Sequence, residues 1–144
     1  MIFGSRQPMK LMSVVHEFWY RATNGVIGGN ILGAHILLLT TTGRKTGKRY
    51  TTPLLYVRDG DDLVVIASNG GAKGDPDWWR NLSADPAAMV QAGGKYRDVH
   101  AEAATGETRE RLWSAITKRY PLYRGYERRT EREIPVVLLH PGAE

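Results

Sequence analysis

An apolar segment that breaks into a glycine-bounded, basic turn does most to constrain how this chain can fold. Three leucines and three threonines fill positions 37–42. Gly43 and Gly47 then bracket a turn that, with the two residues after it, carries four cations, and β-prone residues resume at Tyr50. Two β-prone segments joined by so short a connection favour an antiparallel hairpin.

Similar signals recur along the chain and predict six strands. Asp59-Gly60 and Gly93-Gly94 are turn pairs of the kind that connect hairpins. Pro53 is expected at a sheet edge or a bulge, because proline cannot donate a hydrogen bond to a neighbouring strand. The predicted strands are residues 35–42, 50–58, 63–68, 87–92, 96–104 and 134–139.

Three helices are predicted, at residues 10–24, 76–84 and 107–120. Apolar residues recur at helical spacing in the first of them. Asp75 is expected to cap the second helix, with Pro76 at its first position, and Thr105 is expected to cap the third. Residues 120–132 are aromatic and basic, and we expect them to be irregular.

Six strands with few helices indicate an α+β fold, a mostly antiparallel small barrel or strongly bent sheet with flanking helices. The length of 144 residues suits one domain. Within it, residues 1–33 are expected to form an N-terminal amphipathic helix and a glycine-rich linker, and residues 34–144 the sheet. The apolar face of residues 10–24 packs on the sheet in one interpretation and lies on a membrane or a partner in the other.

Composition excludes several kinds of site. The chain has no cysteine, which rules out disulfides and thiol nucleophiles, and its four histidines are too scattered to predict a metal site. A net charge of +5 favours an anionic ligand. Neither a signal peptide nor an apolar run of ~20 residues is visible. We therefore expect a cytoplasmic protein, with peripheral attachment to the inner face of the membrane through residues 10–24 as a variant.

The basic turn is the first candidate site. Arg44, Lys45, Lys48 and Arg49 lie within six positions, and the glycines let backbone N–H groups approach an anion. Arginine can fork onto phosphate or carboxylate oxygens, while lysine acts as a point charge. The spacing is not that of a phosphate-binding P-loop. The alternative is a charged hairpin exposed to solvent.

A small-residue loop and a pair of tryptophans form the second candidate. Residues 67–71 read Ala-Ser-Asn-Gly-Gly, which leaves room for a ring system whose polar edge could bond Ser68 and Asn69. Trp78 and Trp79 could wall the same pocket, or one of them could be core. Asn81 caps a helix turn or binds the ligand. A flat, anionic cofactor would use all of these features.

Three tyrosines make the third candidate. Tyr120, Tyr123 and Tyr126 are spaced by three, so they would share one ridge if the segment were helical. Phenols can donate a proton or a hydrogen bond to a reducible carbonyl, which suits a substrate pocket. The alternative is packing between elements.

Together these features resemble the deazaflavin-dependent nitroreductase and quinone reductase family. The resemblance covers residues 37–141, with looser similarity before them, and no single piece carries it. The matching pieces are Leu38-Leu39-Thr40-Thr41-Thr42-Gly43-Arg44-Lys45-Thr46-Gly47, Pro53-Leu54, Val57-Arg58-Asp59-Gly60, Ala67-Ser68-Asn69-Gly70-Gly71, Pro76, Trp78, Asn81-Leu82, Asp85-Pro86, Tyr120-Pro121, Tyr123, Tyr126 and Ile134-Pro135-Val136-Val137.

The resemblance implies a split β-barrel that binds the deazaflavin coenzyme F-420 and passes a hydride from it to a quinone or nitroaromatic acceptor. It implies catalytic roles for Ser68, Tyr123 and Tyr126 in polarising the acceptor, and a substrate pocket lined by Leu55, Tyr120, Tyr123 and Tyr126. The coenzyme-binding residues it implies are Arg44, Lys45, Thr46, Arg49, Tyr50, Thr51, Thr52, Pro53, Leu54, Leu55, Ile66, Ala67, Ser68, Asn69, Asp77, Trp78, Trp79, Arg80 and Asn81.

This chain departs from the family pattern at three positions. Many relatives carry arginine where this chain has Tyr50, and Arg49 could compensate. Leu55 stands where the best-known nitroreductases place a pocket tyrosine, and Tyr56 next to it faces the other way by strand alternation. Asp77 occupies a position that is often apolar. These departures bear on the substrate more than on the coenzyme.

Two rival interpretations stay open at this stage. The first is the same barrel with flavin mononucleotide, whose phosphate also needs a cationic turn. The second is a non-enzymatic binder of a lipid, haem or another anionic ligand. A nucleic-acid partner is disfavoured because the basic residues gather in turns without a base-reading motif. An exposed sheet edge would allow a homodimer, without residue evidence for one.

Overall fold

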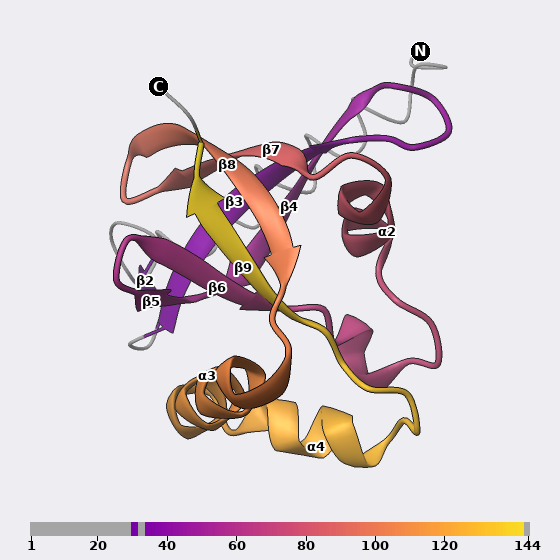
Figure 1. Cartoon of the computed structure of the whole chain (residues 1–144), viewed down its shortest axis with the longest axis vertical. Helices are drawn as coiled ribbons and strands as arrows, with labels where there is room; N and C mark the ends of the chain where they lie inside the picture. The colour runs from indigo at the N-terminus through magenta and orange to yellow at the C-terminus, as the bar shows by residue number, and fades with distance from the viewer. Residues whose placement is uncertain (1–29, 32–33, 143–144) are drawn as a thin grey trace.

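The computed structural model describes residues 30–31 and 34–142, and Figure 1 shows a strongly curled sheet with helices beside and below it. The predicted helix at residues 10–24 lies outside the described residues. The predicted boundary between residues 33 and 34 falls at their edge, because residues 32–33 are not described. The strands are β2 (Asn30–Ile31), β3 (Ala34–Thr42), β4 (Arg49–Leu55), β5 (Val57–Asp59), β6 (Asp62–Ile66), β7 (Ala87–Ala92), β8 (Lys95–Ala103) and β9 (Val136–Pro141). The helices are the short 3-10 turn η1 (Asn69–Gly71), α2 (Asp77–Ala84), α3 (Gly106–Arg119) and α4 (Leu122–Arg128).

The eight strands form one antiparallel sheet in the order β2-β3-β7-β8-β9-β6-β5, with β4 paired to β3 off this path. β4 lies against β3, whereas β5 lies against β6 at the far end of the path. The continuous segment 49–59 therefore links the two ends of the sheet. This link closes the sheet into the predicted split barrel.

The predicted strands are confirmed with shifts of one or two residues at their ends, except the second. That strand is divided at Tyr56, so its first part pairs with β3 and its last three residues with β6. The backbone N–H of Tyr56 donates to the His35 carbonyl at 3.0 Å, and its own carbonyl accepts the Tyr120 hydroxyl at 2.9 Å. These hydrogen bonds fix the backbone where the strand is interrupted. The interruption and the additional short strand β2 raise the number of strands from the predicted six to eight.

The barrel has an apolar interior and a second apolar layer beneath it. Alternate residues of β3, β6, β7, β8 and β9 fill the first layer, together with Trp78 and Leu82 of α2. The opposite face of β6 and β9 packs on α3 and α4 and makes the second layer. Val136, Val137 and Leu139 of β9 are fully buried, and successive residues of this strand serve the two layers in turn.

Helices α2 and α3 differ from the sequence prediction at their N-terminal caps. α2 begins at Asp77 with Pro76 as its N-cap, so the prediction that Asp75 caps it was wrong. The carboxylate of Asp75 is instead bound by Arg132 at 2.8 Å. Thr105 does occupy the N-cap position of α3, but its side chain makes no capping hydrogen bond.

The segment 120–132 is not irregular as predicted, because it contains α4. Its apolar ridge faces α3 and β6, and Tyr123 within it is buried. Tertiary packing therefore stabilises a helix that local composition did not indicate. In the described part of the chain, none of the helices is both long and apolar enough to cross a membrane.

A basic cleft between the β3–β4 turn and helix α2

The basic turn is a compact loop whose backbone bonds close on themselves. The N–H of Gly43 donates to the Lys48 carbonyl at 2.7 Å, and that of Gly47 donates to the Gly43 carbonyl at 2.8 Å. Gly47 has φ +74°, and a Cβ added at Gly43 would lie 2.5 Å from a ring carbon of Tyr50. Glycine is therefore favoured at both positions, because another residue would displace the Tyr50 ring at the first and strain the backbone at the second. With its backbone closed in this way, the turn displays its side chains outward.

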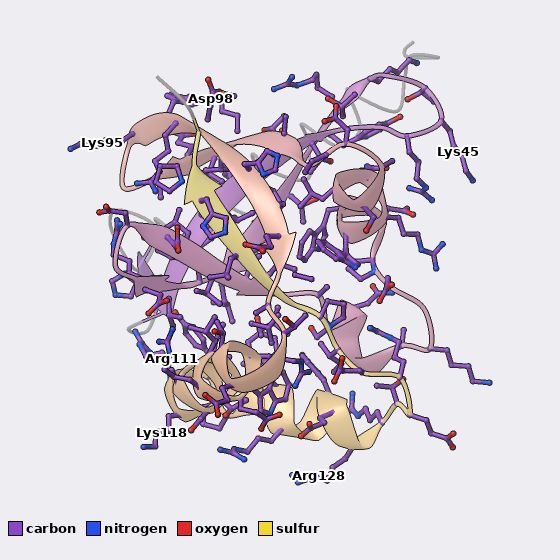
Figure 2. All side chains as sticks on the ribbon, in the orientation of Figure 1. Lys45, Lys95, Asp98, Arg111, Lys118 and Arg128 are labelled. Carbon is purple, nitrogen blue, oxygen red and sulfur yellow. The ribbon has the colours of Figure 1, made fainter. Side chains whose placement is uncertain are left out.

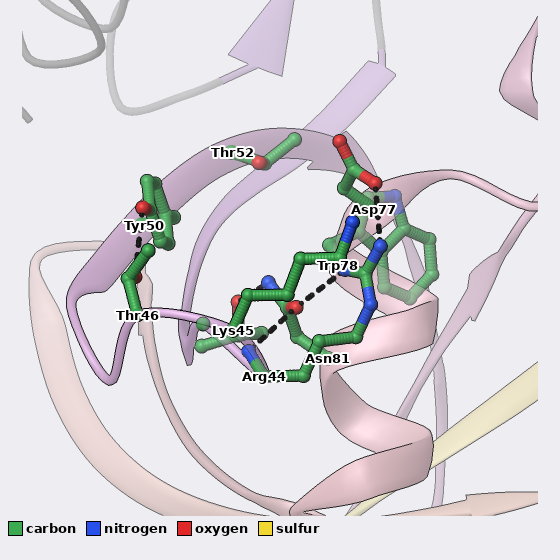
Figure 3. A pocket seen from close by; sticks show the side chains of 10 residues that line it. Arg44, Lys45, Thr46, Tyr50, Thr52, Asp77, Trp78 and Asn81 are labelled. Atoms are coloured by element: carbon green, nitrogen blue, oxygen red, sulfur yellow. Dashed lines mark hydrogen bonds and ion pairs between the residues drawn. The ribbon is translucent and has the colours of Figure 1, made fainter. Parts of the chain in front are cut away.

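A cleft of about 480 Å³ opens between this turn and helix α2. Figure 3 shows Arg44 and Lys45 extending from the turn toward α2, which contributes Asp77, Trp78 and Asn81 to the cleft. The volume is within the usual range for small-molecule sites. The lining residues are Thr41, Gly43, Arg44, Lys45, Thr46, Tyr50, Thr52, Asp77, Trp78 and Asn81. Eight of these are among the predicted coenzyme-binding residues; Thr41 and Gly43 are the two that the sequence did not nominate.

Asn81 fixes Arg44 in the cleft. Its carbonyl oxygen accepts the Arg44 backbone N–H at 3.1 Å and the guanidinium Nη1 at 2.8 Å. The amide nitrogen of Asn81 donates to the buried hydroxyl of Thr41 at 3.3 Å. Because Asn81 is only 4% exposed, it is a rigid support rather than a mobile surface group. This interaction explains why an asparagine follows the tryptophans.

Hydroxyl groups line the other side of the cleft. Tyr50 and Thr52 are two residues apart on β4, so both face the cleft by strand alternation. The hydroxyls of Thr46 and Tyr50 lie 3.0 Å apart, and Thr46 Oγ1 also accepts the Lys48 backbone N–H. The cleft therefore combines cations with neutral donors, a set suited to oxygen atoms of an anion.

The intervening residues of β4 point away from this cleft. Arg49 is exposed, and Thr51 bonds the Thr40 hydroxyl at 2.8 Å. Pro53 lies opposite Leu38 on an edge strand, as predicted. Leu54 is on the same face of β4 as Thr52 but packs on the first apolar layer, and Leu55 packs on the second. A contribution of these residues to coenzyme binding stays a prediction.

Two predicted residues of α2 lie outside the cleft as well. Trp79 is half-buried against the first apolar layer, with its ring centroid 6.5 Å from that of Trp78. Arg80 is exposed. Trp78 is both core and cleft wall, since it is 8% exposed and lines the cavity. The sequence left open whether the tryptophans wall a pocket or belong to the core, and Trp78 does both.

The loop after β6 is held by an arginine that the sequence did not nominate. Ile66, Ala67 and Ser68 are buried, and Asn69 is exposed with its amide donating to the Gly74 carbonyl at 3.0 Å. Arg132 donates to the carbonyls of Ser68 at 2.8 Å, Ala67 at 3.3 Å and Ala72 at 3.0 Å. Its partner is 57 residues away in the sequence, at Asp75. No local pattern could reveal this arginine.

The three tyrosines do form a cluster, but their environments differ. Tyr120 is 4% exposed, and its hydroxyl accepts the His35 N–H at 3.0 Å while donating to Tyr56. Tyr123 is also buried, and burial raises its pKa well above the usual value, with Tyr120 and Tyr126 adding to the shift. Tyr126 is half-buried, with its ring centroid 5.9 Å from that of Tyr123. Of the three, Tyr126 is the most accessible to a ligand.

The loop and the tyrosine cluster adjoin each other. A Cβ added at Gly71 would lie 3.0 Å from the carbonyl oxygen of Tyr126, and Gly71 has φ +84°. η1 therefore packs directly on α4, and only glycine permits so close an approach there. Leu55 contacts the same apolar layer as Tyr120 and Tyr123. Leu55 and the tyrosines thus share one apolar layer, and Ser68 directly precedes η1, which packs on α4.

The closed antiparallel sheet, with a basic cleft between the β3–β4 turn and α2, is a split β-barrel. The solved structure of the F420-H2 dependent reductase FDR-A shares this fold with a TM-score of 0.68 and 39% identity, covering 73% of this chain and 93% of that one. A second solved chain, a domain-swapped dimer, is 34% identical with a TM-score of 0.69, covering 90% of this chain and 98% of the other.

The sequence comparisons narrow this class to one family. The model of the F420H2-dependent quinone reductase family matches residues 12–141. An F420H2-dependent quinone reductase of Mycobacterium tuberculosis is 42% identical over 129 residues, which are 87% of each chain. This chain belongs to the F420H2-dependent quinone reductase family and is a coenzyme F-420-dependent reductase. These relatives lend no support to flavin mononucleotide as the cofactor.

Proposed function

We propose that this protein binds reduced coenzyme F-420 in the basic cleft and uses it to reduce a quinone. The observation that carries the proposal is that Arg44 and Lys45 extend into a cleft that Trp78 and Asn81 also line. The cleft thus combines two cations with an aromatic side chain in a volume of about 480 Å³. A flat, anionic cofactor needs this combination.

The donor set of the cleft fits the coenzyme. Arg44 and Lys45 would bind phosphate or carboxylate oxygens, and the hydroxyls of Thr46, Tyr50 and Thr52 would complete their hydrogen bonds. Asn81 holds the guanidinium of Arg44 in place before any ligand arrives. Such preorganisation lowers the cost of ordering the site on binding.

The bound reduced coenzyme would supply the hydride, and the chain would orient the acceptor and donate a hydrogen bond or proton to its oxygen. Tyr126 is the best-suited donor, because it is half-buried at the edge of the tyrosine cluster. Tyr123 keeps its proton, since burial raises its pKa. Tyr120 already uses its hydroxyl on the backbone. Ser68 would assist from the adjoining loop.

The apolar and aromatic character of this region suits a flat acceptor ring. Leu55 and Tyr126 pack against the buried tyrosines, where the ring of a quinone or of a nitroaromatic would fit. The choice of a quinone rests on the quinone reductases among the relatives. Comparing kcat/KM for menadione and for a bicyclic nitroimidazole tests the choice. A higher value for the nitroimidazole would contradict it.

The binding proposal is tested by titrating the protein with coenzyme F-420 and, separately, with flavin mononucleotide while following tryptophan fluorescence. Arg44→Ala/Lys45→Ala should weaken binding of the deazaflavin by about 100-fold or more, because each lost cation removes a charge-assisted hydrogen bond. The free energy of unfolding should fall by no more than about 1–2 kcal/mol, because Lys45 is exposed and the Asn81 carbonyl oxygen keeps the backbone N–H of residue 44 when the guanidinium is lost. Binding of both compounds should weaken as salt is added.

A matched control removes the same charge elsewhere. Lys95 and Lys118 are exposed, and Figure 2 shows both well away from Lys45. Lys95→Ala/Lys118→Ala should therefore bind the coenzyme within about threefold of the parent, the residual effect of a screened distant charge. Equal affinity of the two double variants would remove the basic cleft from the binding site.

We also propose two features of assembly for direct measurement. Membrane contact through residues 10–24 predicts that vesicles of anionic lipid bind the full chain and not a chain that starts at residue 25. A homodimer, suggested by the domain-swapped relative, predicts a sedimentation mass near twice the 16.1 kDa of one chain. A monomer mass, or equal vesicle binding, would contradict the respective proposal.

A further inference from the structure

We propose that Asp77 weakens the hold of the basic cleft on anions and so speeds their release. This inference rests on the proposed function, because it concerns the same cleft. Of the ten residues that line the cavity, Asp77 is the acidic one, beside the cations Arg44 and Lys45. A carboxylate inside an anion site needs an explanation.

Asp77 stands where it acts on two sources of positive potential. Its Oδ1 lies 3.3 Å from Nη2 of Arg44. It is also the first residue of α2, whose N-terminal end carries the positive pole of the helix dipole. The carboxylate therefore offsets part of the charge of the turn and part of the charge of the helix. An anion that enters the cleft would therefore experience a less positive electrostatic potential from both sources.

The pair with Asp77 is not needed to place Arg44. The side chain of Asp77 is 82% exposed, and ion pairs with so exposed a partner contribute little to stability. Asn81 already accepts two hydrogen bonds from Arg44, at 3.1 and 2.8 Å, and is itself held by Thr41. Removing the Asp77 charge should therefore leave the guanidinium where it is. What changes is the electrostatic potential that a ligand experiences.

The sign and size of the effect follow from Coulomb's law. One unit charge about 7 Å from an anion in a water-rich site changes its affinity by roughly 3- to 10-fold. Ligands with more negative charge near the turn should be affected more than ligands with less. Because the ligand must leave after each turnover, a modest weakening would shorten its residence in the cleft without removing the binding groups.

The test compares Asp77→Asn, which keeps the shape and a hydrogen-bond acceptor, with Asp77→Glu, which keeps the charge. Asp85→Asn is the matched control, because Asp85 follows the other end of α2 and uses its carboxylate on the Ala87 N–H. Coenzyme F-420 and inorganic pyrophosphate are titrated into each protein at about 50 mM and 500 mM salt. Stopped-flow fluorescence gives the release rate of the coenzyme.

Asp77→Asn should bind both anions about 3- to 10-fold more tightly at low salt, with slower release of the coenzyme, and the gain should shrink toward onefold at high salt. Asp77→Glu and Asp85→Asn should match the parent. Unchanged or weaker binding by Asp77→Asn would overturn the inference, and weaker binding would instead make Asp77 an orienting partner of Arg44. Failure of the parent to bind coenzyme F-420 would refute the proposed function, while the pyrophosphate arm would still decide the role of Asp77.

Discussion

Replacing Tyr120 with phenylalanine separates a structural role for this residue from the substrate role that the family resemblance implies. The substitution keeps the ring and removes a hydroxyl that donates to the Tyr56 carbonyl at 2.9 Å and accepts the His35 N–H at 3.0 Å. Tyr56 is 5% exposed, so water cannot replace the lost donor readily. His35 is exposed, so its N–H suffers less. A buried group left without its partner costs about 1–3 kcal/mol, and we expect about 2 kcal/mol here.

For a chain of this length that loss should lower Tm by roughly 6 °C. Urea unfolding followed by tryptophan fluorescence measures the free energy, and Tyr96→Phe is the control because Tyr96 is 66% exposed. The control should stay within about 0.5 kcal/mol of the parent. Steady-state kinetics on the folded Tyr120→Phe protein should give nearly unchanged kcat and KM. Parental stability together with a large loss of kcat would refute the reasoning and return Tyr120 to the substrate pocket.

Two further predictions concern charged groups outside the cleft. The hydrogen bond to Glu102, with that to Asp62 adding to it, raises the pKa of His140 above its ordinary value of 6.5. The folded-state pKa then exceeds the unfolded one, so the added stability is complete below about pH 6 and is lost as pH rises through the folded-state pKa. Urea midpoints measured from about pH 5.5 to 8.5 should fall in the parent relative to His140→Gln; parallel profiles would contradict this. Arg132→Met should destabilise the protein by about 2–3 kcal/mol, because it frees three carbonyls and a carboxylate. Hydrogen exchange should quicken in residues 67–75, with Arg132→Lys recovering part of the protection, and unchanged exchange in Arg132→Met would count against the assignment.

Most of the strands could be predicted because their signals are local. Turns that contain glycine, together with the β-branched residues on either side, locate each hairpin within a few residues, as at Asp59-Gly60 and Gly93-Gly94. The division of the second strand could not be predicted. Its sequence is continuously β-prone, and the break at Tyr56 depends on a hydroxyl 64 residues further along the chain.

The helices show the same limit. Asp75 and Pro76 form a plausible capping sequence, but the ion pair with Arg132 draws the carboxylate away from α2. α4 escapes detection because Gly125 and the two tyrosines weaken its local helical tendency, whereas burial of Tyr123 stabilises it. In each case a contact between distant residues outweighed the local preference.

The candidate site divides in a similar way. The turn and the Trp–Asn sequence could be assigned to one ligand, and the structure does bring Arg44, Trp78 and Asn81 to a single cleft. Ser68 and the tyrosines could be named as candidates from the sequence, but the sequence could not tell which of them is accessible to a ligand. Accessibility distinguishes Tyr126 from Tyr120, and accessibility depends on the packing of α4 against β6 and η1.

The placement of β9 has a consequence for how the protein is made. This strand lies between β6 and β8. Its residue Val136 pairs with Ile66 of β6, although 69 residues lie between the two in the sequence. On the ribosome, the hairpin of β5 and β6 and the pair β7–β8 must therefore wait with unpaired edges until residues 136–141 emerge. Such edges are where nascent chains associate wrongly. Insertion of β9 is therefore a late, non-local step that joins the two parts of the sheet.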